Sequence, residues 1–276
     1  MLRKSLKLKI TPAIAAIAAL SLLLLAATAC GNQRDLTVIV AGSTSVQPFA
    51  ELLAEEYMHI DPEGEVDVQG GGSSAGITAV ESGTADIGMS SRALKESESH
   101  LWSVEIAKDG LAIIIHPGNQ VSDLSFRQLC GIYTGAVVNW KEVGGADAKI
   151  HLITREEGSG TRSAFEELVM GEDAINPRSI VQDSNGAVRQ LVSGDVNSIG
   201  FVSLGLVDET VKAVRMDGVA PTWENVANGS YSLYRPFLYI TLDEPEGHVK
   251  SFIDYTLSAE GQRLLAGEGL IPSADQ

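Results

Sequence analysis

Short β-branched apolar runs alternate along the chain with segments whose apolar residues recur at helical spacing. The first run, LTVIVAG at 36–42, has the length and β-branched content of a buried strand, and a glycine closes it. The next segment, PFAELLAEEYMHI at 48–60, places apolar residues on one face and acids on the other, and its leading proline favours a helix start. Strands that alternate with helices predict parallel sheets covered by helices.

The same alternation continues to the end of the chain, and the fold class that follows is α/β. A glycine ends the last predicted helix, which we expect to be a single amphipathic element. Further strands are expected at 65–69, 86–90, 111–117, 149–155, 198–204 and 232–242, and further helices at 75–83, 163–170 and 249–269.

Residues 1–29 have the pattern of an export signal. Four basic residues and no acid occupy positions 1–9, and an apolar or small-residue run follows up to Cys30. This run is also long enough to span a bilayer, so an uncleaved anchor is the alternative. The segment Ala27–Cys30 resembles a bacterial lipobox, in which the cysteine is acylated and becomes the new N-terminus; the usual leucine is replaced by Ala27.

We therefore predict an exported protein with a lipoprotein signal peptide at 1–29 and a tether at 30–34. The lipid on Cys30 would hold it at the outer face of the cytoplasmic membrane or in the periplasm. Either a lipid or an uncleaved anchor would attach the protein to the membrane and keep residues from 31 onward outside the cytoplasm.

Charge narrows the range of partners. The 276 residues carry a formal net charge of -16, which argues against nucleic acid because binding to a phosphate backbone needs a basic face. A small anion is compatible with this charge, since a buried site can bind one through backbone amides and a single arginine. The length allows one large or two modest domains.

Metal and cofactor chemistry have no support in the sequence. The chain has two cysteines, Cys30 and Cys130, with no CxxC pair, and its histidines show no ligand spacing, so we expect neither metal nor cofactor. Cys130 lies in an apolar-periodic stretch and is expected to be a small buried residue. We expect the three tryptophans to pack in the core or hinge: Trp102, Trp140 and Trp223.

Three loops rich in hydroxyl side chains and glycine each follow a strand and precede a helix. They are AGSTS at 41–45, GGGSSAG at 70–76 and EEGSGTR at 156–162. One such loop is ordinarily a helix N-cap. Three of them, at the carboxyl ends of strands, indicate a site where backbone N–H groups and hydroxyls hold an oxyanion.

Arg155 ends a predicted strand just before the third loop. Its guanidinium could donate two hydrogen bonds to a tetrahedral anion. A surface salt bridge to Glu156 or Glu157 explains the same residue equally well at this point.

Six sequence blocks occur in the order found in one known family, across essentially the whole chain after the leader. They are AGSTSVQP, VQGGGSSAG, DIGMSSR, IYTGAVVNWKEVGG, TREEGSGTR and IGFVSLG. With them the chain resembles the phosphate-binding subunit of the bacterial high-affinity phosphate ABC importer. The resemblance implies a protein without catalytic activity that captures inorganic phosphate, delivers it to the membrane permease of the importer and works as a monomer.

The resemblance also implies a two-lobed periplasmic-binding-protein fold, the type II clamshell, which buries its anion by closing about a hinge. Lobe one would comprise 35–116 and 236–276, and lobe two 117–235. Two crossing segments, near His116–Pro117 and Tyr234–Pro236, would form the hinge.

Carried over residue by residue, the family motifs supply a set of phosphate ligands and one supporting acid, Glu157, which would orient the arginine. Some family members have aspartate at the position of Ser91, where it accepts a hydrogen bond from the protonated ligand oxygen and repels sulfate. A serine can accept but adds no like-charge repulsion, so discrimination against sulfate is predicted to be weaker here. The expected ligands are Thr44, Ser45, Ser73, Ser91, Arg155, Ser159, Gly160 and Thr161.

Three alternatives stay open. One is a binding protein for another oxyanion such as sulfate, molybdate or a phosphonate, and another is an exported adhesion or signalling module. The third is a serine hydrolase, because 72–76 matches G-x-S-x-G with Ser74 as the nucleophile. The only late histidine, His248, lies in a polar turn, and no HGGG sequence is present.

Overall fold

The structure, a computed structural model, describes residues 37–62 and 64–273. The chain from Val38 onward forms one compact unit. The predicted signal peptide, the tether and Cys30 lie outside the described residues. Within the described ranges, no helix has the length and apolar character needed to cross a membrane.

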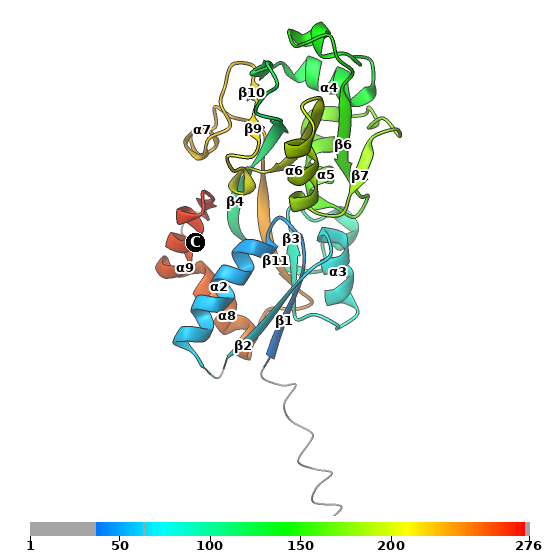
Figure 1. Ribbon diagram of the computed structural model, residues 1–276. Coiled ribbons are helices and arrows are strands. Elements are labelled where there is room, and N and C mark those ends of the chain that lie inside the picture. Colours follow the sequence, from blue (N-terminus) through cyan, green and yellow to red (C-terminus); the bar gives the residue numbers. More distant parts are fainter. Residues whose placement is uncertain (1–36, 63, 274–276) are drawn as a thin grey trace, which may run out of the picture. The chain divides into compact units, whose positions relative to one another are not determined.

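One mixed sheet runs through this unit, and two long strands occupy its middle (Figure 1). The flanking pairs β1–β3, β6–β7 and β6–β8 are parallel, as the alternating pattern predicts. The middle strand β11 is antiparallel to both its neighbours. The spatial order is β2 (Glu65–Gly70), β1 (Thr37–Gly42), β3 (Ile87–Ser90), β11 (Tyr234–Thr241), β4 (Trp102–Ile115), β8 (Ser198–Ser203), β6 (His151–Arg155) and β7 (Ile180–Gln182).

Most helices agree with the periodicity, with two informative differences. The C-terminal helix is interrupted at Ser258, which adopts an extended conformation and accepts a hydrogen bond from the Gly261 N–H, so it caps a second helix. A polar helix, α6, was not predicted. The helices are α2 (Gln47–Ile60), α3 (Ser73–Glu81), α4 (Phe126–Thr134), α5 (Gly160–Phe165), α6 (Asn185–Gly194), α7 (Trp223–Ala227), α8 (Gly247–Leu257) and α9 (Ala259–Gly267).

Short elements complete the chain. A π-helical turn, η3 (Glu166–Met170), continues α5, and 3₁₀ turns connect other elements. These turns are η1 (Glu96–Glu98), η2 (Trp140–Val143) and η4 (Leu204–Leu206), and the short strands are β5 (Asp123–Leu124), β9 (Lys212–Ala213), β10 (Arg215–Met216) and β12 (Ile271–Pro272).

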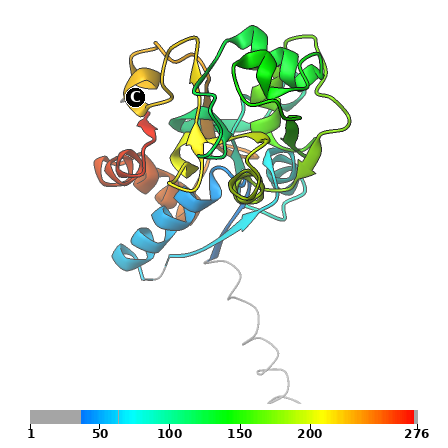
Figure 2. The ribbon, with the colours of Figure 1, turned by 45° about the horizontal axis from the view of Figure 1, so that its top comes forward.

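The apolar side chains form separate cores on either side of a point within β4. The first core takes Ile106 and Ala107 from β4, together with residues of β1, α2, β11, α8 and α9. Figures 1 and 2 both show α2 alongside α8 and α9. The second core begins at Leu111 and includes residues of α4 and β8. The alternate residues Ala112 and Ile114 face a third cluster with α6, as expected for strand geometry.

The packing therefore changes between Ala107 and Leu111. Within 111–115, which was expected in lobe one, Leu111, Ile113 and Ile115 pack in the second core, and the alternate residues pack in the third cluster. At the point of change β4 and β11 are paired, with Gly110 opposite Tyr234 and Asp109 opposite Arg235.

Two expectations about single residues need correction, and a third agrees with the structure. Cys130 is only partly buried, and its thiol lies 3.6 Å from Asp173, because it sits at the edge of the second core. Trp223 is 62% exposed because it opens the short helix α7, so it is not a core residue. Trp140 is buried, as expected.

Candidate functional site

The three hydroxyl-rich loops meet between the two cores. The first lies between β1 and α2, the second leads into α3, and the third joins β6 to α5. Ser45 and Thr161 place their hydroxyl oxygens 2.8 Å apart, and the Ser74 N–H donates to the Gly158 carbonyl at 3.2 Å. The expected ligands are all buried except Thr44, which is half-buried.

Glycine permits this close approach. A Cβ on Gly160 would lie 2.2 Å from Ser73 Oγ and 2.6 Å from Ser91 Oγ. A Cβ on Gly76 would likewise lie 2.5 Å from the Ala41 carbonyl oxygen, so α3 can pack against the end of β1 only without a side chain there.

Ser91 belongs to a group of neighbouring hydroxyls that lie close to Gly160. Its Oγ accepts a hydrogen bond from Ser43 Oγ at 2.8 Å and lies 3.4 Å from Ser73 Oγ. Its backbone N–H donates to Ser73 Oγ at 3.1 Å. At this position the protein therefore has a buried neutral group.

Arg155 is 1% exposed and is held from several sides. Its Nε and Nη2 donate to the two carboxylate oxygens of Glu156, each at 2.9 Å, and Nη2 also donates to Thr44 Oγ1 at 3.2 Å. The carbonyls of Gln182 and Asp183 accept further bonds. Nη1 is buried and has no partner among the described residues. The two N–H donors of Nη1 on a desolvated cation are therefore left over for a ligand.

The acid that orients Arg155 is Glu156, and the expected role of Glu157 is corrected. The Ser159 N–H donates to the Glu156 carbonyl, which closes a turn over residues 156–159. This turn brings the Glu156 side chain back along the guanidinium and leaves Glu157 at an exposed position. The two interpretations of Arg155 are thus compatible: it forms an ion pair and also lies among the candidate ligands.

Four buried polar residues that the sequence did not suggest lie behind the hydroxyls. Asn185 Nδ2 donates to Ser45 Oγ at 2.8 Å, and Arg235 Nη2 donates to the same oxygen at 3.0 Å. Arg235 forms an ion pair with Asp109 at 3.0 Å, and Ser203 Oγ donates to Asp109 at 2.7 Å. The sequence signal that could have found this ion pair is the charge of Asp109 and Arg235, which interrupts the apolar runs of β4 and β11.

Burial opposes the charges of this ion pair. It raises the pKa of Asp109, although Arg235 and Ser203 counteract the shift. It lowers the pKa of Arg235, which Asp109 counteracts and the nearby positive charge of Arg155 reinforces. Two arginines therefore lie close to one set of hydroxyls.

A second ion pair supports the segment after Ser91. Arg92 is 4% exposed and donates from Nη1 and Nη2 to the carboxylate of Glu98 at 2.7 and 2.8 Å. The Lys95 N–H also donates to Glu98. These bonds fix the loop that follows β3.

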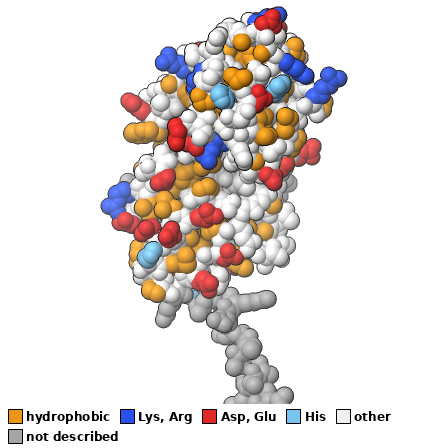
Figure 3. All heavy atoms as spheres, viewed as in Figure 1, with side chains coloured by type: hydrophobic (Ala, Val, Ile, Leu, Met, Phe, Trp, Pro, Cys, Tyr) orange, Lys and Arg blue, Asp and Glu red, His pale blue; other side chains and the backbone are white. Residues whose placement is uncertain are grey.

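The residues of the hydrolase alternative and the possible metal ligands can be placed in the structure. In residues 37–62 and 64–273, no group of three or more potential metal-ligating side chains occurs. His248 lies in α8, which packs with α2 and α9, whereas Ser74 lies in α3, which packs with β3 and β11. Figure 3 shows acidic and basic side chains scattered over the displayed face.

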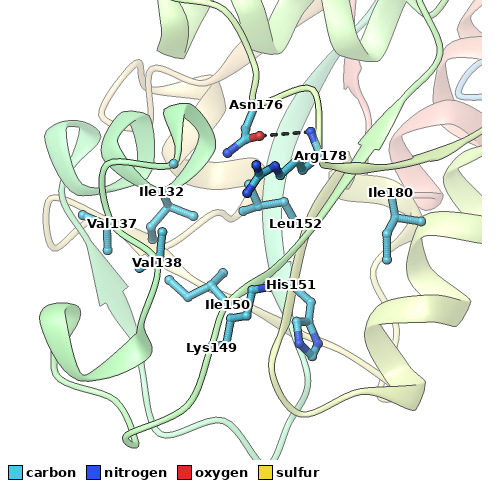
Figure 4. Close-up of a pocket in the computed structure, with 11 residues that line it drawn as sticks. Ile132, Val137, Val138, Lys149, Ile150, His151, Leu152, Asn176, Arg178 and Ile180 are labelled. Carbon is cyan, nitrogen blue, oxygen red and sulfur yellow. Dashed lines mark hydrogen bonds between the residues drawn. The ribbon is translucent and has the colours of Figure 1, made fainter.

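A separate cavity of about 290 Å³ lies beside the second core (Figure 4). Its walls are mainly apolar, and its cationic residues, Lys149 and Arg178, are exposed. The Arg178 N–H donates to Asn176 Oδ1 at 3.0 Å at one edge. The apolar wall consists of Ile132, Val137, Val138, Ile150, Leu152 and Ile180.

Comparison with known proteins identifies the family. The PBP superfamily domain matches residues 27–260. The phosphate-binding protein PstS of Bacillus subtilis is 34% identical over 246 residues, which cover 87% of this chain and 81% of that protein. The chain belongs to the PstS family within this superfamily.

Solved structures of similar proteins agree with this assignment. A putative phosphate ABC transporter substrate-binding protein with bound phosphate from Clostridium perfringens is 46% identical, with a TM-score of 0.84 over 86% of this chain and 100% of that one. An ABC-type phosphate transport receptor from Vibrio cholerae is 41% identical, with a TM-score of 0.73 over the same shares. The α/β periplasmic-binding-protein fold expected from the resemblance is confirmed.

Proposed function

We propose that this protein captures inorganic phosphate between its two lobes outside the cytoplasm and delivers it to the permease of an ABC importer. The observation that carries the proposal is the buried guanidinium of Arg155, with an unpartnered Nη1 among hydroxyls from three loops. A similar protein with bound phosphate supports the choice of ligand. The family consists of transport proteins that bind a substrate, and we propose no catalytic activity.

The phosphate oxygens would be held by the hydroxyls, backbone N–H groups and guanidinium of the expected ligands. A desolvated phosphate needs many donors and compensating positive charge, and Arg155 provides both. Glu156 takes the orienting role once expected of Glu157. The proposed ligands are Thr44, Ser45, Ser73, Ser91, Arg155, Ser159, Gly160 and Thr161.

We place the boundary between the lobes where the core changes. The crossing segments would be 108–110 in β4 and 234–236 in β11, which pair with each other. Lobe two would then comprise about 111–233, with the remaining described residues in lobe one. The buried ion pair of Asp109 and Arg235 would lie at this hinge.

The proposal also includes attachment to the membrane. A lipid on Cys30 would hold the protein near the permease while the lobes open and close, and a monomer suffices for that transfer. Mass spectrometry of the mature N-terminus would detect the acylated cysteine, whereas an intact leader would indicate an uncleaved anchor.

Calorimetric titration tests the ligand. The chain from Gly31 to Gln276, freed of bound anion by partial unfolding, is titrated with phosphate and then with sulfate near neutral pH. We expect tight one-to-one phosphate binding and weaker sulfate binding. A preference for sulfate would instead favour the second oxyanion candidate, which the neutral residue at Ser91 keeps open. Absence of oxyanion binding would refute the site.

A matched variant tests Ser91 itself. Because the carboxylate of Ser91→Asp can accept a hydrogen bond from a protonated phosphate oxygen but repels sulfate, we expect phosphate binding to persist and sulfate binding to fall. The same titrations measure both effects. Complete loss of phosphate binding in this variant would contradict the proposed role.

A further inference from the structure

Ser45 is the point where the hydrogen bonds of the site converge. Its side chain is fully buried, and its Oγ has three partners. Asn185 Nδ2 lies at 2.8 Å, Arg235 Nη2 at 3.0 Å and Thr161 Oγ1 at 2.8 Å.

The chemistry of these partners determines which way the Ser45 hydrogen points. A hydroxyl accepts two hydrogen bonds and donates one. The amide nitrogen of Asn185 and the guanidinium of Arg235 can only donate, so they occupy both acceptor positions of Ser45. The Ser45 hydroxyl must therefore donate to Thr161 Oγ1.

The orientation of the Asn185 amide is itself determined. Its Oδ1 accepts the backbone N–H of Ser203 at 3.2 Å. The flipped amide would turn its NH₂ group against this N–H and place two donors face to face. Asn185 therefore presents a donor to Ser45.

The direction of the Ser45 hydrogen bond determines which hydroxyl hydrogens remain free to bond with the ligand. Thr161 Oγ1 accepts from Ser45 and has no other partner among the described residues, so its own hydrogen remains available. Thr44 Oγ1 accepts from Arg155 Nη2 at 3.2 Å and from Asn185 Nδ2 at 3.5 Å, so it too keeps its hydrogen. Both threonines are among the proposed phosphate ligands.

We propose that Asn185 and Arg235 are positioning residues that set the hydrogen direction of the site, so that Thr161 meets phosphate as a donor. This inference rests on the proposed function. A hydroxyl free to rotate would present a lone pair to the anion in part of its states, whereas a donor that is preset in the closed site needs no reorganisation to bond with the anion. Neither residue has to touch phosphate for this effect.

A double-mutant cycle tests this series of hydrogen bonds from Asn185 through Ser45 to Thr161, which we call the relay. Asn185→Leu, which is similar in size, removes the amide donor without adding charge, and Thr161→Val removes the terminal hydroxyl. We expect Asn185→Leu to weaken phosphate binding about tenfold in the wild-type background. In the Thr161→Val background the same change should have an effect of about threefold or less, because only the long contact of Asn185 with Thr44 at 3.5 Å then links it to a proposed ligand.

Asn119→Leu is the matched control, since Asn119 is also a buried asparagine but donates to the Val196 carbonyl in lobe two. It should lower the melting temperature without changing phosphate affinity. Equal effects of Asn185→Leu in both backgrounds, or no effect in either, would overturn the relay. If that variant does not fold, Asn185→Ala replaces it with the same expected coupling. Wild-type protein that does not bind phosphate would instead refute the proposed function and the relay with it.

Discussion

The hydroxyl cluster between the two cores and the apolar pocket of Figure 4 differ in how they hold their cations. In the cluster, Arg155 and Arg235 are 1% and 2% exposed, and both have hydroxyl partners. In the pocket, Lys149 and Arg178 are exposed beside aliphatic walls. The cluster combines side chains from loops far apart in the sequence, whereas the pocket is lined by residues within 132–180.

The difference shows that an open cavity and a site for an anion are separate properties. A charge kept out of water interacts strongly with a ligand, whereas an exposed charge is weakened by hydration and salt. In the cluster the hydroxyls of Ser45 and Thr161 already bond with each other, so the space for a ligand is small until the lobes separate. Buried, incompletely paired donors therefore identify the anion site better than volume does.

The strongest test of the difference between the two regions removes one arginine from each. Arg155→Ala should weaken phosphate binding about a thousandfold, or about 4 kcal/mol, because it removes a buried charge and its hydrogen bonds. Arg178→Ala should leave the affinity within about twofold. Calorimetric titration measures both, and similar losses in the two variants would contradict the assignment.

The buried ion pair should differ from exposed charges in its effect on folding. Arg235→Met leaves Asp109 buried without its partner and should lower the free energy of unfolding by about 3 kcal/mol. The double variant Asp109→Leu/Arg235→Met should recover most of this loss. Lys149→Met, at the pocket, should change stability by less than about 0.5 kcal/mol. Urea denaturation compares the three, and a neutral Arg235→Met would refute the expectation.

The closeness of the loops can be tested at Gly160. A methyl group there would collide with the hydroxyls of Ser73 and Ser91, so Gly160→Ala should hold the lobes apart and weaken phosphate binding about thirtyfold, or about 2 kcal/mol. Gly194→Ala, where an added Cβ meets nothing within 4 Å, is the control and should bind normally. Titration of both variants decides the matter; unchanged binding by Gly160→Ala would show that the loops need not meet.

The smallest effect concerns acids that support the two regions. Hydrogen bonds from Arg92 lower the pKa of Glu98 below its ordinary value of 4.5. Because the folded-state pKa is depressed, this pair stabilises the protein fully above about pH 4.5, and the stabilisation is lost as the pH falls through the lowered pKa. Glu98→Gln should therefore destabilise the protein by about 1–2 kcal/mol at pH 7 and progressively less below pH 4.

A more exposed pair of charged groups at the edge of the pocket is the comparison for the Arg92–Glu98 pair. Asp195 contacts His151 at its edge; burial alone would raise the pKa of Asp195, but bonds from His151, Asn197 and Ser198 lower it overall. Since both partners are more than one-third exposed, Asp195→Asn should change stability by less than about 1 kcal/mol at pH 7. Urea denaturation at pH 3, 5 and 7 tests both variants, and a pH-independent effect of Glu98→Gln would contradict the ion-pair explanation.

The sequence by itself determined the local elements and the chemistry of the loops. Strand runs such as 36–42 and the helix at 48–60 are found where their patterns predict them, since each depends on residues close together in the chain. The three hydroxyl-glycine loops were recognisable for the same reason. Their meeting point followed from a general property of strands, whose carboxyl ends gather at one edge of a sheet.

Tertiary structure alone decided which distant polar residues stand behind those loops. Asn185 and Arg235 meet Ser45 across long stretches of chain, and a polar residue in a helix or strand ordinarily indicates a solvent-facing position. The choice of Glu156 over Glu157 depended on a turn that only the folded loop makes. The point within β4 where the core changes depended on which helices cover each half of a strand that is apolar over both. Such long-range pairings carry no periodic pattern. The local sequence therefore indicated the hydrogen-bond donors of the site, but it could not show which distant residues they pair with.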